Sequence, residues 1–190
     1  MHPGLKYILL VKEGSTLTNK IYIVGSVGSG KSTLARRISE AFGFAYFESD
    51  SIIHEPDPDS PTGTRRRTEA ERDALIDEVL TQERWIAEDT GRRIFEMLWQ
   101  EADSIILLEP PVFIRKYRFI LRWVKQVLRL EKCIYRPGLY MLKLMFKWTK
   151  DYETGVGTVK DRLVPYQDKV SVLRTQYDIE RYINQVKEDY

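Results

Sequence analysis

One short stretch, residues 25–32, constrains this chain more than any other feature. It reads GSVGSGKS and fits the P-loop pattern G-x-x-x-x-G-K-[ST]. The apolar run 21–24 precedes it, and a helical pattern over 31–42 follows and stops at Gly43. Strand, glycine loop and helix in this order form the context in which the pattern binds phosphate. The sequence therefore predicts an α/β fold built around a phosphate-binding loop.

The residue types of the loop suit a nucleotide. Glycine tolerates backbone angles closed to other residues, so successive N–H groups can converge on one anion, and the helix start adds its positive end. Lys31 is expected to reach the β- and γ-phosphates, and Ser32 to place its hydroxyl on Mg²⁺. The predicted nucleotide-binding residues are Gly25, Ser26, Val27, Gly28, Ser29, Gly30, Lys31, Ser32 and Thr33.

Composition bounds the remaining possibilities. The 190 residues carry a net charge of +2 and suit a single domain over 20–190, preceded by an extension over 1–19. Residues 6–12 of that extension read as an extra edge strand or as a disordered leader. The single cysteine, Cys133, cannot form an internal disulfide, which favours a reducing, cytoplasmic setting. No segment approaches the ~20 apolar residues of a membrane span, so we expect no membrane partner.

Apolar runs and turn signals divide the domain into alternating strands and helices. Short strands are predicted at 20–25, 44–47, 85–87, 104–108 and 170–173. Helices are predicted at 31–42, 68–81, 92–101, 112–130, 139–150, 158–168 and 178–187, and Thr68 with Glu71 forms a capping box. Residues 54–64, rich in proline, read as an exposed loop. The arginines at 65–67 then either bind a substrate phosphate or lie in solvent.

Acidic residues follow two of the predicted strands. Asp50 comes after the second strand, at the sheet edge where open α/β proteins bind ligands. It is a candidate to hold Mg²⁺ or to take the proton of an attacking hydroxyl, although it also suits a turn cap. Glu88 or Asp89, after the third strand, is the alternative acid. The sequence leaves open which of the three carboxylates serves the metal or the acceptor.

The helix predicted at 112–130 is unusually basic. Cations recur on one face at spacings of 3, 4, 3 and 4, and no acid lies between Glu109 and Glu131 to pair with them locally. We favour a lid helix whose Arg118 and Arg122 close on the transferring phosphoryl group. A solvated face and a surface for nucleic-acid backbone are the alternatives. The cations are Arg115, Arg118, Arg122, Lys125 and Arg129.

With these features in place, the chain resembles the DNA topology modulation (FlaR-like) family of P-loop NTPases, which is related to adenylate kinase-like nucleoside and nucleotide kinases. The matching words are IYIVGSVGSGKSTLARRISEAFG, Asp50 after FAYFES, ERWIAED, EADSIILLE and YRFILR. The resemblance implies a three-layer αβα sandwich with a five-stranded parallel sheet and a helical lid over about 112–168. It also implies ATP–Mg²⁺ on the P-loop, lid arginines at Arg118 and Arg122, and an acceptor pocket between Asp50 and the third strand.

The function expected from the residues and the resemblance is transfer of the γ-phosphoryl group of ATP to a small acceptor such as a nucleoside or nucleotide. Lys31, Asp50, Arg118 and Arg122 are the expected catalytic residues, and Ser32 and Asp50 the expected metal ligands. The alternative is a nucleotide-dependent DNA-binding protein, although the sequence holds no DNA-reading module. The family usually has an Asp-Gly-Asn-like turn where this chain has Glu88-Asp89-Thr90, so the acceptor stays open.

Overall fold

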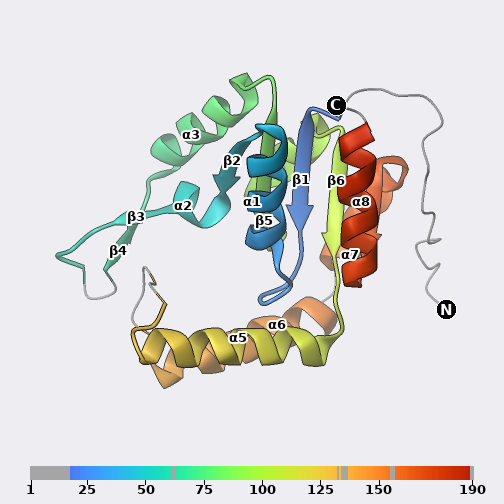
Figure 1. The fold of residues 1–190 in the computed structure, drawn as a ribbon. Helices are drawn as coiled ribbons and strands as arrows, with labels where there is room; N and C mark the ends of the chain where they lie inside the picture. The colour runs from blue at the N-terminus through green and yellow to red at the C-terminus, as the bar shows by residue number, and fades with distance from the viewer. Residues whose placement is uncertain (1–17, 61–62, 132, 134–136, 155–156, 189–190) are drawn as a thin grey trace.

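The computed structural model describes residues 18–60, 63–131, 133, 137–154 and 157–188. The predicted extension, apart from its last two residues, lies outside this range. The core is a five-stranded parallel sheet, as the family resemblance implied, and its strand order is β2-β5-β1-β6-β7 (Figure 1). Its strands are β1 Lys20–Val24, β2 Ala45–Glu48, β5 Trp85–Asp89, β6 Ser104–Leu108 and β7 Val170–Leu173.

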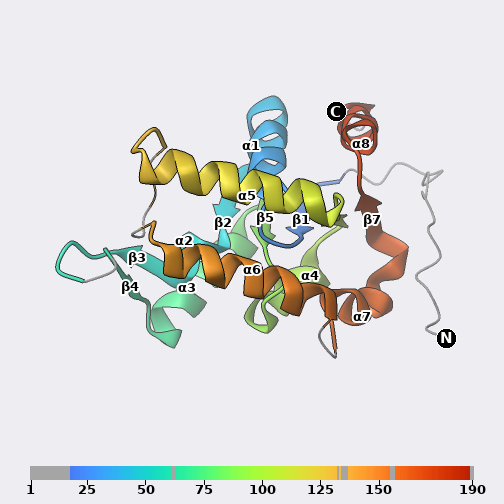
Figure 2. The ribbon, with the colours of Figure 1, turned by 90° about the horizontal axis from the view of Figure 1, so that it is seen from below.

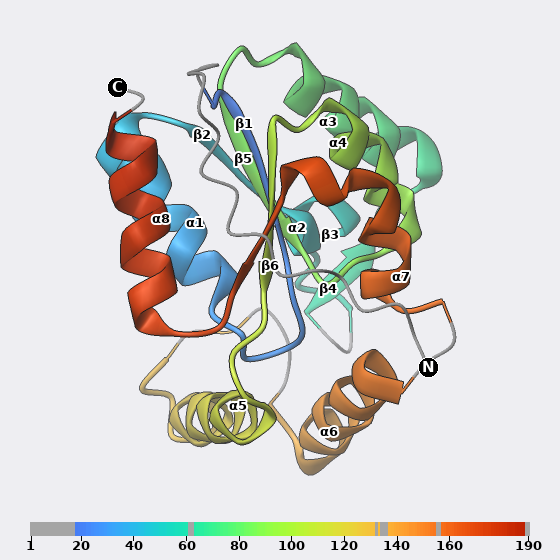
Figure 3. The ribbon, with the colours of Figure 1, turned by 90° about the vertical axis from the view of Figure 1, so that its right-hand side faces the viewer.

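Side chains of the sheet alternate between two apolar layers, which is why its strands read as continuous apolar runs. On one face Ile21, Ile23 and Ile86 pack against α1 Lys31–Phe42 and α8 Gln176–Glu188. On the other face Tyr22 and Ala87 pack among residues of the helices α2 Ser49–Ile53, α3 Glu69–Thr81, α4 Glu96–Glu101 and α7 Val159–Leu163. The three layers are visible side-on in Figure 3.

Helix boundaries follow the local signals closely. The predicted helix over 31–42 is α1, ended by Gly43 in the left-handed conformation. The predicted capping box begins α3, because Thr68 accepts from the Glu71 amide while the Glu71 carboxylate accepts from the Thr68 amide. Helix 92–101 is shorter than predicted: a 3₁₀ turn, Arg93–Phe95, precedes α4. The predicted helix over 158–168 divides likewise into α7 and a 3₁₀ segment, Val164–Lys169.

The stretch 54–64 departs from the expectation of a plain loop. Its ends form an antiparallel ribbon of two short strands, β3 His54–Pro56 and β4 Thr64–Arg66. Glu55 holds the ribbon by ion pairs with Arg65 and Arg67, and Arg65 also pairs with Glu71. Local residue types, dominated by proline and acids, gave no strand signal there, since the ribbon depends on charge pairs between its two arms.

Two helices close the carboxyl edge of the sheet. They are α5 Val112–Val127 and α6 Leu139–Thr154, which lie side by side across this edge in Figures 2 and 3. The rings of Phe119 and Phe146 meet edge-to-face between them, with centroids 5.0 Å apart. None of the helices among the described residues is both long enough and apolar enough to cross a bilayer. The pair occupies the side of the sheet where the predicted site residues gather.

Candidate phosphate and acceptor site

The P-loop links β1 to α1 in the geometry that an anion-binding loop requires. Gly28 and Gly30 have φ values of 75° and 103°, in the left-handed region that favours glycine. A Cβ on Gly28 would lie 2.5 Å from the carbonyl oxygen of Arg115, because the loop packs directly against the start of α5. Among the described residues, the buried hydroxyls of Ser26 and Ser29 have no hydrogen-bond partner. Such a polar, incompletely satisfied cradle fits a bound phosphate chain.

Two predicted site residues at the start of α1 turn toward one carboxylate. The Ser32 hydroxyl donates to Glu88 Oε1 at 2.7 Å. Lys31 Nζ lies 3.8 Å from Glu88 Oε2 and donates to the Ser26 carbonyl oxygen at 3.3 Å. Both ends of the ion pair are nearly buried, with side chains 10% and 6% exposed. The lysine and the serine expected at the phosphates and the metal therefore share Glu88 as their partner.

Strand alternation explains why Glu88 takes this position. Ile86, two residues earlier in β5, packs on the α1 face of the sheet, so Glu88 faces the start of α1 as well. Burial raises the pKa of the Glu88 carboxyl, and the nearby Lys31 ammonium and the Ser32 hydrogen bond oppose that shift. A carboxylate held at the junction of lysine and serine can accept hydrogen bonds from water on a metal ion.

The neighbouring carboxylates have different partners. Asp89 faces the opposite side of β5 and accepts from the Gly91 amide at 2.7 Å and from Arg92 Nη1 at 2.9 Å. Arg92 Nη2 in turn donates to Asp50 Oδ1 at 2.5 Å. Asp89 thus fixes the turn after β5, and Arg92 joins that turn to Asp50 on α2. Asp50 contacts Arg92, whereas Ser32 contacts Glu88. A metal role for Asp50 therefore stays a prediction.

The basic helix is only partly as the sequence suggested. Its cations have no acid within the helix, but two of them pair with acids beyond it: Arg115 is buried and pairs with Glu153, and Arg122 Nε lies 3.1 Å from Glu131 Oε1. Both acids lie outside the helix, where local spacing could not identify them. Arg118 Nη1 donates to the Ser29 carbonyl oxygen at 2.9 Å, which brings it onto the P-loop. Arg118 therefore lies against the P-loop and Arg122 lines the cavity, and their roles at a phosphoryl group stay predictions.

These groups surround one cavity of about 420 Å³. The P-loop contributes Lys31 and Ser32 to its wall, and α2 and β5 contribute Asp50 and Glu88. The lid region contributes Arg122 together with the apolar side chains Met141, Met145 and Trp148. Phosphate-binding, acidic and apolar surfaces thus face one another across a space large enough for part of a nucleotide and a small molecule.

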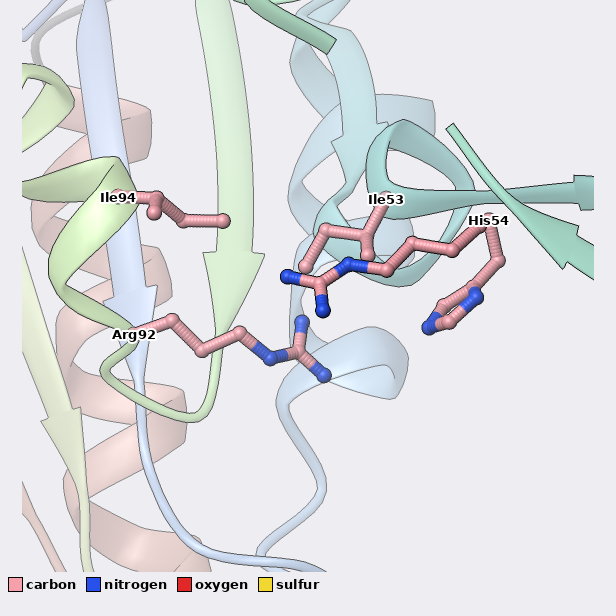
Figure 4. Close-up of a pocket in the computed structure, with 5 residues that line it drawn as sticks. Ile53, His54, Arg92 and Ile94 are labelled. Carbon is pink, nitrogen blue, oxygen red and sulfur yellow. The ribbon is translucent and has the colours of Figure 1, made fainter. Parts of the chain in front are cut away.

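A second hollow of about 380 Å³ adjoins this cavity and shares His54 and Arg92 with it. Figure 4 shows Arg92 extending from the turn after β5 toward the α2 side of the hollow, where Ile53 and His54 lie. Arg66 of β4 completes its lining with Ile94. Burial lowers the pKa of His54. The negative charge of Asp50 opposes this shift, and the positive charges of Arg92 and Arg66 add to it. Two guanidinium groups and a neutral imidazole therefore line this hollow.

The sequence identified the loop, and it named Arg66 only as one of three arginines at 65–67 that either bind a phosphate or lie in solvent. It gave no signal for His54 and Trp148, which line the cavities from separate segments and carry no motif. Among the described residues, no group of three or more His, Cys, Asp or Glu side chains is placed to hold a metal ion. A metal at this site would depend on phosphate oxygens and water in addition to Ser32 and Glu88, which is the usual arrangement for Mg²⁺.

Parts of the chain are similar in sequence to shikimate kinases. The chain is 36% identical over 80 residues to a shikimate kinase of Actinobacillus succinogenes, a match covering 37% of this chain and 43% of that protein. A chloroplastic shikimate kinase of Oryza sativa subsp. japonica is 46% identical over 35 residues, 18% of this chain and 11% of the relative. The matches thus span less than half the length of these relatives. No protein-family model matches the chain.

Solved structures share the fold over nearly the whole chain. A gluconokinase from Sinorhizobium meliloti 1021 superimposes with a TM-score of 0.53 at 16% identity, covering 92% of this chain and 93% of that one. A shikimate kinase from Acinetobacter baumannii in complex with shikimate gives 0.50 at 17% identity, covering 90% and 92%. At such low identity this likeness concerns the fold, and it agrees with the predicted kinase-like α/β sandwich.

Proposed function

We propose that the protein is a phosphotransferase that moves the γ-phosphoryl group of ATP, with Mg²⁺, to a small acceptor. The observation that carries the proposal is that Lys31 and Ser32 of the P-loop share one cavity with Asp50 and the lid. A donor and an acceptor held in one cavity need only positioning and charge stabilisation for transfer. The sequence similarity to shikimate kinases supports the same class of reaction.

The residues divide between nucleotide, metal and transferring group. The loop amides and Lys31 hold the phosphates, and Lys31 exchanges its contact with Glu88 for phosphate oxygens when a nucleotide enters. Ser32 and Glu88, joined by a hydrogen bond at the start of α1, are the residues that would hold a magnesium ion. Magnesium, when bound, neutralises charge on the β- and γ-phosphates. Arg118, already on the P-loop, and Arg122, in the cavity wall, stabilise the charge on the transferring group.

Asp50 faces the acceptor in this proposal. Its carboxylate, oriented by Arg92, receives or orients the proton of the attacking hydroxyl. The adjoining hollow offers Arg92 and Arg66 to an anionic group on the acceptor. We therefore propose an acceptor that bears both a hydroxyl and a carboxylate or phosphate, a description that includes nucleotides, shikimate and gluconate. Closure of the lid region, about 112–168, excludes water during transfer.

A coupled assay of ADP release across a panel of acceptors tests the proposal. The panel contains nucleosides, nucleotides, shikimate, gluconate and their uncharged analogues. We expect ADP release that depends on an anionic hydroxy compound, and no release by Lys31→Ala. In Arg92→Lys, which keeps the charge but loses the two-pronged contact, KM for the acceptor should rise while KM for ATP stays unchanged. Turnover that persists in Lys31→Ala would reject the site.

The finer family assignment also stays a proposal. The matching sequence stretches favour the DNA topology modulation (FlaR-like) group, and we propose a kinase domain over 20–190. The single cysteine favours a cytoplasmic location. The DNA-binding alternative loses its main support, because Arg115 is buried against Glu153 and Arg122 pairs with Glu131. A continuous row of exposed cations, which DNA backbone would require, is thereby interrupted.

A further inference from the structure

Helix α5 carries an apolar stripe on the side that faces solvent. Phe113 and Tyr117 are 71% and 66% exposed, and Leu128, just after the helix, is 61% exposed. The spacing of the stripe places it on one side of the helix. Its members are Phe113, Tyr117, Leu121, Val124 and Leu128. Phe119 and the guanidinium of Arg115 are instead buried on the inner side. An ordinary surface helix turns its apolar face inward, so this outward stripe needs a partner.

The charge around the stripe is positive. Residues 112–127 contain three arginines, two lysines and no acidic residue. Lys116 and Lys125 are exposed on α5. The adjacent α6 exposes Lys143, Lys147 and Lys150 at spacings of 4 and 3, and of these Lys147 pairs with Asp151. Figure 2 shows the two helices together spanning one side of the molecule. The partner that this side fits is therefore both apolar and anionic.

We propose that this surface, the α5 stripe with the flanking lysines of α5 and α6, docks on a membrane containing anionic phospholipid. A helix with aromatic and leucine side chains on one face and cations beside them lies in the bilayer interface, with its apolar face among the acyl chains. Each cation near an anionic leaflet adds to the attraction. A second copy of the chain fits less well, because it would bring two cation-rich helices together. The sequence expectation of no membrane partner considered only spanning segments.

Vesicle co-sedimentation tests the proposal on the full chain. We expect binding to phosphatidylcholine vesicles containing about 30% phosphatidylglycerol, weaker binding to pure phosphatidylcholine, and a decline from about 0.1 M to 0.5 M salt. The double variant Phe113→Ser/Tyr117→Ser should bind the anionic vesicles about tenfold or more weakly. The control is Tyr177→Ser, which removes a 73% exposed tyrosine from α8 and should bind like the wild type.

Four outcomes would overturn the proposal. They are absence of binding to anionic vesicles at low salt, equal binding by the double variant, equal loss in Tyr177→Ser, and binding indifferent to lipid charge. Sedimentation velocity distinguishes the competing occupant. A concentration-dependent dimer that disappears in Phe113→Ser/Tyr117→Ser, without vesicle binding, would assign the stripe to a second copy. Both substituted side chains are mostly exposed, so the variants should fold, and far-UV circular dichroism checks this.

Discussion

Replacing Glu88 by glutamine tests the metal end of the site most directly. The substitution keeps the shape of the side chain and an oxygen that can accept from the Ser32 hydroxyl, now at 2.7 Å. It removes the negative charge that lies 3.8 Å from Lys31 Nζ. If Glu88 holds water on the magnesium ion, the variant should need far more Mg²⁺ for turnover while remaining folded.

The magnitudes come from opposing effects. At an effective dielectric constant near 20, two unit charges about 4 Å apart attract by roughly 4 kcal/mol, which the variant loses. Burial of the Glu88 charge opposes this, and its effect is the larger one because the pKa of Glu88 is raised despite Lys31. The variant should therefore be no less stable to unfolding than the wild type at neutral pH in the absence of nucleotide. Loss of a group that orients metal-bound water typically weakens metal affinity about 10- to 100-fold.

The assay is ADP release at fixed ATP while Mg²⁺ is titrated, with urea unfolding measured in parallel. Asp89→Asn is the matched control, because Asp89 is equally buried but contacts the Gly91 amide and Arg92. We expect this control to lower the free energy of unfolding by about 2 kcal/mol or more and to leave the Mg²⁺ titration unchanged. The reasoning fails if Glu88→Gln destabilises the protein strongly and its Mg²⁺ titration matches that of the wild type.

Four further predictions follow from single contacts. Lys31→Ala should bind magnesium nucleotide too weakly for calorimetry to detect, and normal binding would contradict the assigned phosphate site. Gly28→Ala should cost more stability in urea unfolding than the ~1–2 kcal/mol of left-handed strain expected for Gly43→Ala, since its Cβ would meet an α5 carbonyl oxygen at 2.5 Å, whereas Gly43 has open space. Because burial raises the pKa of Glu88, the unfolded state loses this proton at lower pH than the folded state. The stability of the wild type relative to Glu88→Gln should therefore fall as the pH rises from 4.5 through the raised pKa. A difference in stability that does not change with pH would argue against a buried carboxylate. Arg118→Met should reduce kcat about 100-fold or more with little change in the unfolding midpoint, and an unchanged kcat would remove Arg118 from the transferring group.

The sheet and its principal helices were predictable because their signals are local. The P-loop pattern identified the junction of β1 and α1, and the Thr68–Glu71 capping box identified the start of α3. The ribbon of β3 and β4 was not predictable, since Glu55 pairs with arginines ten or more residues away and the strands have three residues each. Such short strands have no periodicity to detect.

The acids of the site were predicted only as a set. The sequence left Asp50, Glu88 and Asp89 as alternatives, and in the structure Glu88 contacts Ser32 while Asp50 and Asp89 share Arg92. One signal was available for Glu88. Side chains two residues apart on a strand face the same side, so Glu88 faces α1 if Ile86 does. Which side Ile86 faces, however, depends on how the sheet packs against its helices. The arginines at 65–67 were named from the sequence as phosphate binders or solvated charges. The position of Arg66 beside His54 depends on the ribbon, for which the sequence gave no signal.

The cations of α5 show why helical periodicity specifies a face but not a function. Arg115, Arg118 and Arg122 share one face, yet successive turns rise about 5.4 Å along the axis and reach different surroundings. Arg115 is buried and pairs with Glu153, Arg118 donates to the Ser29 carbonyl oxygen, and Arg122 lines the cavity. Because these arginines and the buried Phe119 take the inner face, apolar residues such as Phe113 and Tyr117 lie on the outer face. The helix that completes the phosphate site is therefore the same helix that must find an apolar partner outside the domain.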